Sequence, residues 1–350
     1  MKNDTKCLKT GYISGNGEPL ALPIYQSTTY TYDSTDDIGK LFDLAADGHM
    51  YSRISNPTVA YYEQKLAALE GGIGAVCTTS GQAASFLSLF NICTAGQHFI
   101  ACAKIYGGTY NLFNVTMRRM GIDCTFIDQD ASEDEIQKAF RPNTRAVFGE
   151  SLANPALSVL DIEKLARIAH KNGVPLIVDN TFPTPIFCNP IRFGADIVVH
   201  STTKYLDGHA TCVGGVVIDS GNFVWDKNRY PELTTPDESY HGLTYTESFG
   251  KAAYITKLRV QLIRDLGMYP AAFSAFLTDL GTQTLGVRME RHAKNALTVA
   301  KYLEKRPEIE RVNYPGLESD PYHELAMKYM PDGQSGVMSI VFKGGRNAAV

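Results

Sequence analysis

From residue 61 onward, short apolar runs alternate with longer segments whose apolar residues recur at the spacing of a helix. The predicted strands cover residues 75–79, 98–101, 124–127, 146–148, 176–178 and 197–199, with a further one at 215–219. The predicted helices cover residues 61–69, 83–93, 109–120, 133–140 and 162–171. Because strands and helices alternate with short turns between them, the sequence predicts an α/β fold with a mainly parallel sheet covered by helices on both faces.

The pattern is different on either side of this region. Residues 1–60 are rich in Gly, Pro, Ser, Thr and Tyr and predict an irregular arm with one helix near residues 36–46. Residues 222–240 predict a polar loop, and residues 246–266 and 284–305 predict long helices. A small αβ unit begins near Glu310, and the strand predicted at 337–342 is followed by only a few residues. We therefore expect an arm (1–60), a large domain (61–250) and a smaller C-terminal α/β domain (251–350) that is incomplete because the sequence is cut short.

A lysine stands just past the apolar run at 197–199, in the segment Ser201-Thr202-Thr203-Lys204, and Asp179 ends an earlier run 25 residues before it. Ligands of open α/β sheets bind at the carboxyl ends of the strands, so we expect these side chains to share a site. A lysine amine can form a Schiff base with pyridoxal phosphate, hydroxyl groups can bind its phosphate, and a carboxylate can keep its pyridine nitrogen protonated. Taken singly, Asp179 also suits a turn cap and Lys204 a surface position. Together they predict a catalytic lysine and a pyridoxal phosphate enzyme.

A second segment suits the phosphate of such a cofactor. Ser80-Gly81-Gln82 lies between a predicted strand and a predicted helix. Free amides at a helix N-terminus, with a glycine that permits close approach, form a phosphate site. A strand-to-helix turn also uses small residues for geometric reasons, so this segment gains weight only in combination with Ser201 and Thr203.

Three further positions have both a functional and an ordinary interpretation. Tyr106 opens a predicted helix, where it can stack on a flat cofactor and take part in proton transfer, or simply pack. Asn154 follows the predicted strand at 146–148 and can bind a phenolic oxygen of the cofactor or shape a turn. Tyr51 and Arg53 lie in a polar loop whose arginine suits bidentate phosphate contact, although a surface loop is the simpler explanation.

Composition and the lack of certain motifs argue against several classes of protein. A net charge of −4 gives no reason to expect nucleic acid or an anionic membrane as a partner. The seven cysteines contain no CxxC pair and the eight histidines no HExxH, so neither a metal nor a disulfide framework is expected. No run approaches the length of a membrane span and the polar start lacks a signal-peptide core, so we expect a cytoplasmic protein. The absence of GxGxxG after the first strand argues against a dinucleotide-binding dehydrogenase.

Five segments together resemble the Cys/Met-metabolism enzymes that depend on pyridoxal phosphate. They are YSRISNPT (51–58), SGQAA (80–84), YGGTYNLF (106–113), VDNTF (178–182) and HSTTKY (200–205). The resemblance extends from about residue 10 to the end of the sequence. It implies a fold-type I transferase built on a mainly parallel, seven-stranded sheet.

The resemblance also implies a role for each matching residue. Lys204 would carry the cofactor and shuttle protons, Asp179 would pair with the pyridinium, and Tyr106 would stack on the ring. Asn154 would contact the phenolic oxygen. The phosphate would be held by Ser80, Gly81, Gln82, Ser201 and Thr203, with Tyr51 and Arg53 reaching it from the adjacent subunit of a dimer within a homotetramer.

Within the family, residues 106–113, 239–242, 264–267 and 288–292 and the glycine at 108 most resemble O-acetylhomoserine sulfhydrylase. This implies that O-acetylhomoserine reacts with sulfide or methanethiol to give homocysteine or methionine, plus acetate. The alternatives are a methionine or cystathionine γ-lyase or a cystathionine γ-synthase of the same family, or a catalytically silent truncated homologue. The arginine with which the family binds the substrate carboxylate belongs to a later segment that is absent here, so we expect cofactor binding with poor turnover.

Overall fold

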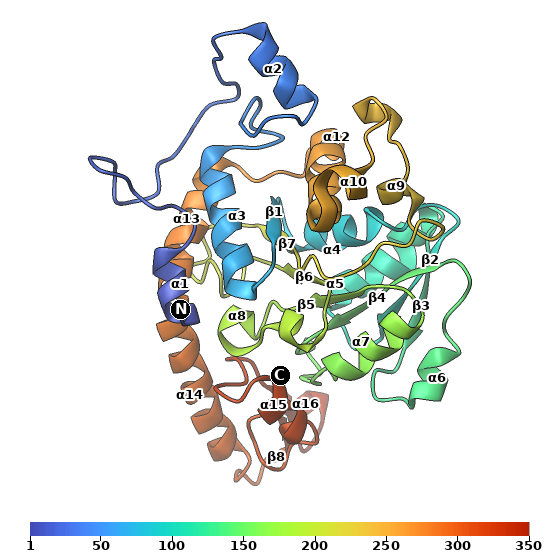
Figure 1. Ribbon diagram of the computed structural model, residues 1–350. Helices are drawn as coiled ribbons and strands as arrows, with labels where there is room; N and C mark the ends of the chain where they lie inside the picture. The colour runs from blue at the N-terminus through green and yellow to red at the C-terminus, as the bar shows by residue number, and fades with distance from the viewer. Residues whose placement is uncertain (350) are drawn as a thin grey trace.

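The computed structural model describes residues 1–349 and contains a seven-stranded sheet with helices on both sides (Figure 1). The strands lie in the order β1-β7-β6-β5-β4-β2-β3, and β7 runs antiparallel to β1 and β6 while the other pairs are parallel. Their bounds are β1 (Gly74–Thr78), β2 (His98–Cys102), β3 (Asp123–Ile127), β4 (Thr144–Glu150), β5 (Leu176–Asp179), β6 (Ile197–His200) and β7 (Gly215–Asp219). The predicted α/β class and the mainly parallel sheet are confirmed.

Helices cover the sheet because its central strands are apolar on both faces: every residue of β2, β4 and β6 is buried. The covering helices are α3 (Pro57–Glu70), α4 (Gly81–Phe90), α5 (Gly107–Asn111), α6 (Glu133–Gln137), α7 (Ile162–Lys171) and α8 (Thr184–Phe187). Among them, α4 packs on β6 and β7, and α7 packs on β4 and β5. In Figure 1, α7 and α8 lie below the sheet and α10 and α12 above it.

Local signals fix the ends of α3. The side chain of Asn56 accepts a hydrogen bond from the amide of Thr58 at 3.0 Å, and Pro57 occupies the first helical position. The helix ends at Gly71, whose φ of 82° is the left-handed conformation that glycine adopts without strain. The last residue of α3, Glu70, is thereby placed against the carboxyl ends of the sheet strands.

Two predicted helices are wrong as continuous α-helices. The segment 246–266 forms α10 (Tyr245–Phe249), α11 (Ala253–Lys257) and α12 (Arg264–Leu266), joined by the 3₁₀ helix Gly250–Ala252 and the π-helix Leu258–Ile263. The break falls at Gly250, whose φ of 52° lies outside the helical range. The segment 109–120 is divided between α5 and the π-helix Leu112–Met117. Apolar periodicity does not distinguish these helix types, because their spacings differ by less than a residue per turn.

The flanking regions contain the predicted helices near residues 36–46 and 284–305 and the strand predicted at 337–342, together with short elements that the pattern did not indicate. The N-terminal helix α1 (Asn3–Lys9) packs against α14, and α2 (Thr35–Phe42) lies at the tip of an arm that leaves the body of the molecule (Figure 1). The predicted loop at 222–240 contains α9 (Pro231–Thr234). After α13 (Ala272–Gln283) and α14 (Leu285–Leu303), β8 (Ile309–Asn313) pairs antiparallel with β9 (Ser339–Phe342). Helices α15 (His323–Tyr329) and α16 (Arg346–Ala349) complete the described chain.

Searched over residues 1–349, the helices include none with both the length and the apolar character that a membrane crossing requires.

Candidate active site

A cavity of about 260 Å³ opens at the carboxyl ends of β4, β5 and β6. Its walls include nine of the eleven side chains expected from the sequence: Ser80, Gly81, Gln82, Tyr106, Asn154, Asp179, Ser201, Thr203 and Lys204. They come from segments up to 124 positions apart (204 minus 80), so the fold itself brings them together. The wall also contains Glu150, Leu152, Thr181, Phe182 and Val213, which the sequence did not single out.

Asp179 is held rigidly where β5 ends. Its Oδ1 accepts hydrogen bonds from the amide of Thr181 at 3.0 Å and from the hydroxyl of the same residue at 2.5 Å. That hydroxyl oxygen also accepts from the amide of Ser201 at 2.9 Å, which ties the ends of β5 and β6 together. Burial raises the pKa of Asp179, although the bonds from Thr181 oppose the shift. A cation placed against Asp179 would favour its ionised form.

The start of α4 forms a cradle with the turn after β6. The hydroxyl of Ser80 accepts from the amide of Ala83 at 3.1 Å and caps the helix, which leaves the first amides of α4 at the cavity. A Cβ on Gly81 would lie 2.6 Å from the Cβ of Ser201, so only glycine permits this approach. Helix amides and a glycine at a close approach are the usual components of a phosphate site.

Gln82 and Thr203 differ in whether their side chains already have hydrogen-bond partners within the described chain. Gln82 donates from Nε2 to the hydroxyl of Thr109 at 3.3 Å, while its Oε1 is buried with no hydrogen-bond partner among residues 1–349. A buried unpaired oxygen at a cavity is a position where a ligand donor is expected. Thr203 is engaged within the chain, because its hydroxyl accepts from the amide of Gly214 at 3.0 Å.

Lys204 follows the turn after β6, and its amide donates to the carbonyl of Ser201 at 3.3 Å.

Glu150 is a further carboxylate in the wall of the cavity. It ends β4 and pairs with Asp179 of β5 in the strand register. Its Oε1 accepts from the amide of Tyr106 at 2.6 Å and its Oε2 from the amide of Asn154 at 3.3 Å. Burial, followed by the charge of Asp179, raises the pKa of Glu150 to about 8. The sequence signal for Glu150 is the one that revealed Asp179, an acidic residue at the end of an apolar strand.

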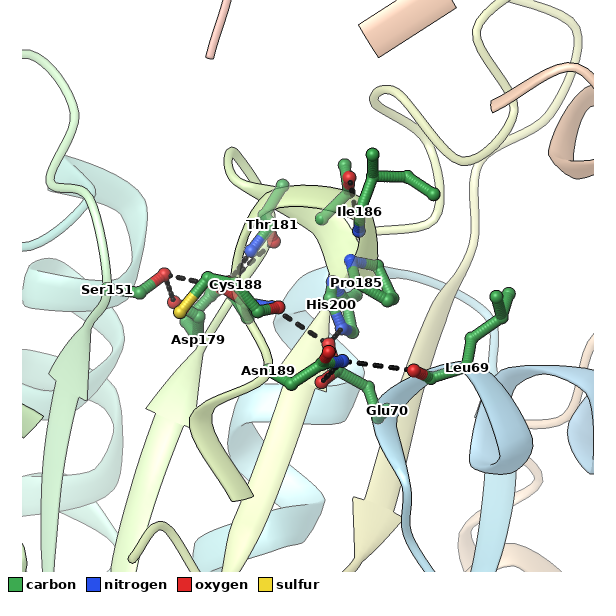
Figure 2. A network of polar contacts seen from close by, with 12 residues as sticks. Leu69, Glu70, Ser151, Asp179, Thr181, Pro185, Ile186, Cys188, Asn189 and His200 are labelled. Atoms are coloured by element: carbon green, nitrogen blue, oxygen red, sulfur yellow. Dashed lines mark hydrogen bonds and ion pairs between the residues drawn. The ribbon is translucent and has the colours of Figure 1, made fainter. Parts of the chain in front are cut away.

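Figure 2 shows a network of polar contacts that includes Asp179, Ser151 and Glu70. The hydroxyl of Ser151 donates to Oδ1 of Asn180 at 2.8 Å, which joins the turns after β4 and β5. Asn180 in turn donates from Nδ2 to Oε1 of Glu70 at 2.8 Å. The residue that follows Asp179 is therefore held by buried partners.

Tyr51 and Arg53 do not line the cavity of their own chain. The guanidinium carbon of Arg53 lies 5.2 Å from the ring centre of Tyr51, and its Nη1 donates to the carbonyl of Arg264. Their expected contact with a neighbouring subunit stays a prediction.

The cavity fits pyridoxal phosphate in its chemistry. The α4 N-terminus, approached closely through Gly81, suits the phosphate, Asp179 suits a protonated ring nitrogen, and Lys204 suits the aldehyde. Residues 4–350 match the family model described as Cys/Met metabolism PLP-dependent enzyme. The chain belongs to this family. The resemblance seen in the sequence is thereby confirmed, and so is dependence on pyridoxal phosphate as a property of the family.

Named relatives are similar over most of the chain. The homocysteine/cysteine synthase of Kluyveromyces lactis is 46% identical over 95% of this chain and 75% of its own length. The O-acetyl-L-homoserine sulfhydrylase of Leptospira meyeri is 46% identical over 93% of this chain and 75% of its own length.

Two solved structures have folds similar to that of this chain. A putative O-acetylhomoserine (thiol)-lyase of Campylobacter jejuni, which contains a pyridoxyl-lysine monophosphate residue, superposes with a TM-score of 0.94 at 37% identity. That comparison covers 98% of this chain and 86% of the other. The metB protein of Corynebacterium glutamicum superposes with a TM-score of 0.84 at 32% identity, over 100% of this chain and 80% of the other.

Proposed function

We propose that this protein is an O-acetylhomoserine sulfhydrylase, which exchanges the acetate of O-acetylhomoserine for sulfide or methanethiol and yields homocysteine or methionine. The observation that carries the proposal is that Lys204 and Asp179 line one cavity with the α4 N-terminus. The choice of substrate is supported by relatives that are named for this compound or for homocysteine synthesis. The reaction balances without an oxidant, because the thiol forms the new C–S bond and acetate leaves with the bonding electrons of the C–O bond.

The roles of the site residues follow from their chemistry. Pyridoxal phosphate, when bound, supplies an electron sink for the carbanion that forms at the α-carbon of an amino acid. Lys204 would hold the cofactor, and its Nζ would then move the α-proton. The carboxylate of Asp179 would keep a proton on the pyridine nitrogen, and Asn154 would bind the phenolic oxygen. The first amides of α4, with Ser80, Gly81, Gln82, Ser201 and Thr203, would bind the phosphate.

Tyr106 has an exposed fraction of 50% although it lines the cavity, so ligand binding can cover it. We assign it to stacking on the cofactor ring and to proton transfer at its hydroxyl. Leu152, Phe182 and Val213 provide apolar wall where the carbon chain of the substrate would lie. An apolar wall beside the reacting atoms also excludes water that would compete with the thiol.

We further propose that the functional unit is a dimer within a homotetramer, in which Tyr51 and Arg53 complete the cavity of the neighbouring subunit. The arm presents apolar side chains to solvent, with exposed fractions of 78% for Ile13 and 88% for Leu20, which a second copy would cover. The arm (1–60) would then reach the neighbouring subunit. The large domain (61–250) would bind the cofactor, beside the smaller C-terminal domain (251–350). A cytoplasmic location suits the six buried cysteines, each an unpaired thiol.

The test is a product analysis on purified protein of verified mass, supplied with pyridoxal phosphate. O-acetylhomoserine plus sulfide should yield homocysteine and acetate in equal amounts, and methionine alone should yield no α-ketobutyrate. α-Ketobutyrate and ammonia from methionine would instead make the protein a γ-lyase. The variant Lys204→Ala is the control, because it should lose the homocysteine signal while it retains the fold.

A further inference from the structure

Glu150 has no part in the reaction as proposed above, yet it lines the cavity with an exposed fraction of only 5%. Carboxylates are rarely buried to this extent unless they are paired or hydrogen-bonded. No lysine or arginine forms an ion pair with Glu150 within residues 1–349. Its partners are two main-chain amides, and both belong to residues that we assign to the cofactor.

The first partner is the amide of Tyr106, at 2.6 Å from Oε1. Tyr106 precedes the short helix α5 and has no side-chain cap of its own. The second partner is the amide of Asn154, at 3.3 Å from Oε2. Tyr106 follows β2 and Asn154 follows β4, so the two oxygens of one carboxylate connect separate loops around the cavity.

We propose that Glu150 is a positioning residue of the cofactor site, whose carboxylate fixes the main chain of Tyr106 and of Asn154 so that both side chains face the cofactor. This inference rests on the proposed function, since it requires pyridoxal phosphate in this cavity. Once Glu150 is ionised, its hydrogen bonds from the two amides are charge-assisted and about twice as strong as neutral ones, which suits a group that holds two loops at once.

The charge of Glu150 has a second consequence. Glu150 and Asp179 are neighbours on β4 and β5, and both lie in the same wall. A carboxylate beside a second carboxylate is favoured only when a cation is near, and the protonated pyridine nitrogen would be that cation. The positioning contact is therefore strongest when the cofactor is present.

Glutamine is the decisive replacement because it has nearly the same shape. Its single amide oxygen can accept from Tyr106 or from Asn154, but its NH₂ group then faces the other amide, donor against donor. The variant Glu150→Gln therefore keeps the packing and loses one of the two contacts. Aspartate keeps the charge but is one methylene shorter, so Glu150→Asp retains at most one contact at its present length.

The experiment measures the dissociation constant of pyridoxal phosphate and the visible circular dichroism of the bound cofactor, which reports the asymmetry of the groups around its ring. Glu150→Gln should raise the dissociation constant about tenfold. The same variant should lose most of the visible dichroic band of the bound cofactor. Glu150→Asp should have a dissociation constant and a band intensity between those of Glu150→Gln and the wild type. The matched control is Asp196→Asn: Asp196 is also buried and accepts from the amide of Leu176 at 2.8 Å, but it lies at the opposite end of the sheet. That variant should unfold more easily and bind the cofactor as the wild type does.

A double-mutant cycle with Tyr106→Ala shows whether Glu150 acts through Tyr106. If it does, Glu150→Gln changes the dissociation constant less in the Tyr106→Ala background than in the wild type. Wild-type affinity and dichroism in Glu150→Gln, or full additivity in the cycle, would overturn the inference. Failure of the wild type to bind pyridoxal phosphate would instead refute the proposed function. If Glu150→Gln does not fold, Glu150→Asp replaces it: weaker cofactor binding and a smaller dichroic band than in the wild type support the inference, and wild-type values overturn it.

Discussion

Nε2 of His200 lies 2.7 Å from Oε1 of Glu70, and both side chains are almost completely buried (Figure 2). The contact joins the last residue of α3 to the last residue of β6, directly before Ser201. Glu70 also accepts from Nδ2 of Asn180 at 2.8 Å and from Nδ2 of Asn189 at 3.2 Å. One carboxylate thus supports the segment that follows Asp179 at the end of β5 and the end of β6, directly before the Ser201–Lys204 turn.

Removing this carboxylate should destabilise the protein strongly. In Glu70→Leu, Nε2 of His200 loses its partner, and its Nδ1 is already buried with none among the described residues 1–349. We expect the free energy of unfolding to fall by about 3 kcal/mol, as for other buried polar partners that are removed from one side only. Urea denaturation measures this. The control is Glu163→Leu, which removes an exposed ion pair with Lys328 and should change stability by less than about 1 kcal/mol. Equal effects would contradict the assignment.

Two adjacent glycines should differ sharply in what they tolerate. A Cβ on Gly108 would lie 2.5 Å from Cε1 of Tyr106 and 2.9 Å from Nε2 of Gln82, whereas a Cβ on Gly107 would meet nothing within 4 Å. Gly108→Ala must therefore displace the Tyr106 ring and should weaken cofactor binding about tenfold, roughly the worth of one misplaced ring contact. Because Tyr106 is half exposed and free to move, thermal stability should change little. Gly107→Ala is the control and should bind cofactor normally; equal affinity in both variants would show that Tyr106 adapts.

The shared active site can be tested by mixing two inactive variants. If Arg53 completes the cavity of the neighbouring subunit, each active site takes Lys204 from one subunit and Arg53 from the other. In a mixed dimer one site then contains both changes and the other contains neither. Random reassembly should restore roughly a quarter of wild-type activity, since half of the dimers are mixed and each has one intact site. Activity that stays at the level of the separate variants would show that Arg53 does not complete the cavity of a neighbouring subunit.

The sheet could be predicted from the sequence because its central strands are continuous apolar runs ended by polar residues. Asp179 and Lys204 were found for the same reason, since Asp179 stands directly after such a run and Lys204 in the polar turn that follows another. Because parallel strands end at the same edge, Asp179 and the Ser201–Lys204 segment were expected to share a site, whereas roles for Tyr106 and Asn154 were implied only by the resemblance to the family. The position of Gly81 against Ser201 needed coordinates, because the sequence shows a glycine but not what it approaches.

The residues that the sequence did not reveal are those whose importance depends on a distant partner. Glu70 ends a helix, where an acidic residue is normally solvated, and its burial follows only from the packing of α3 against the sheet. Glu150 resembles any acidic residue that ends a strand until the amides of Tyr106 and Asn154 are seen to converge on it. Tyr51 and Arg53 lie outside the cavity of their own chain, so a single subunit does not reveal their use.

His98 should make the protein sensitive to mild acid. It lies fully buried at the start of β2, with Nδ1 2.9 Å from the hydroxyl of Thr144 and Nε2 2.8 Å from that of Thr125. Burial, helped by the positive charge of Arg141, lowers the pKa of His98 to about 4. The unfolded chain binds a proton near the ordinary pKa of about 6.5, whereas the native state excludes it until about pH 4. Stability is therefore lost as pH falls between these values, by at most about 1.4 kcal/mol per pH unit for one proton.

The variant His98→Gln can hydrogen-bond both threonines but takes up no proton. Its free energy of unfolding should decline less steeply than that of the wild type between pH 6.5 and about 4, and the two curves should converge as the pH falls. His241→Gln, at a side chain that is 87% exposed, controls for the loss of a histidine as such and should run parallel to the wild type. Urea denaturation at half-unit pH intervals gives the slopes. If the His98→Gln curve also runs parallel to the wild type, the acid sensitivity belongs to another buried group.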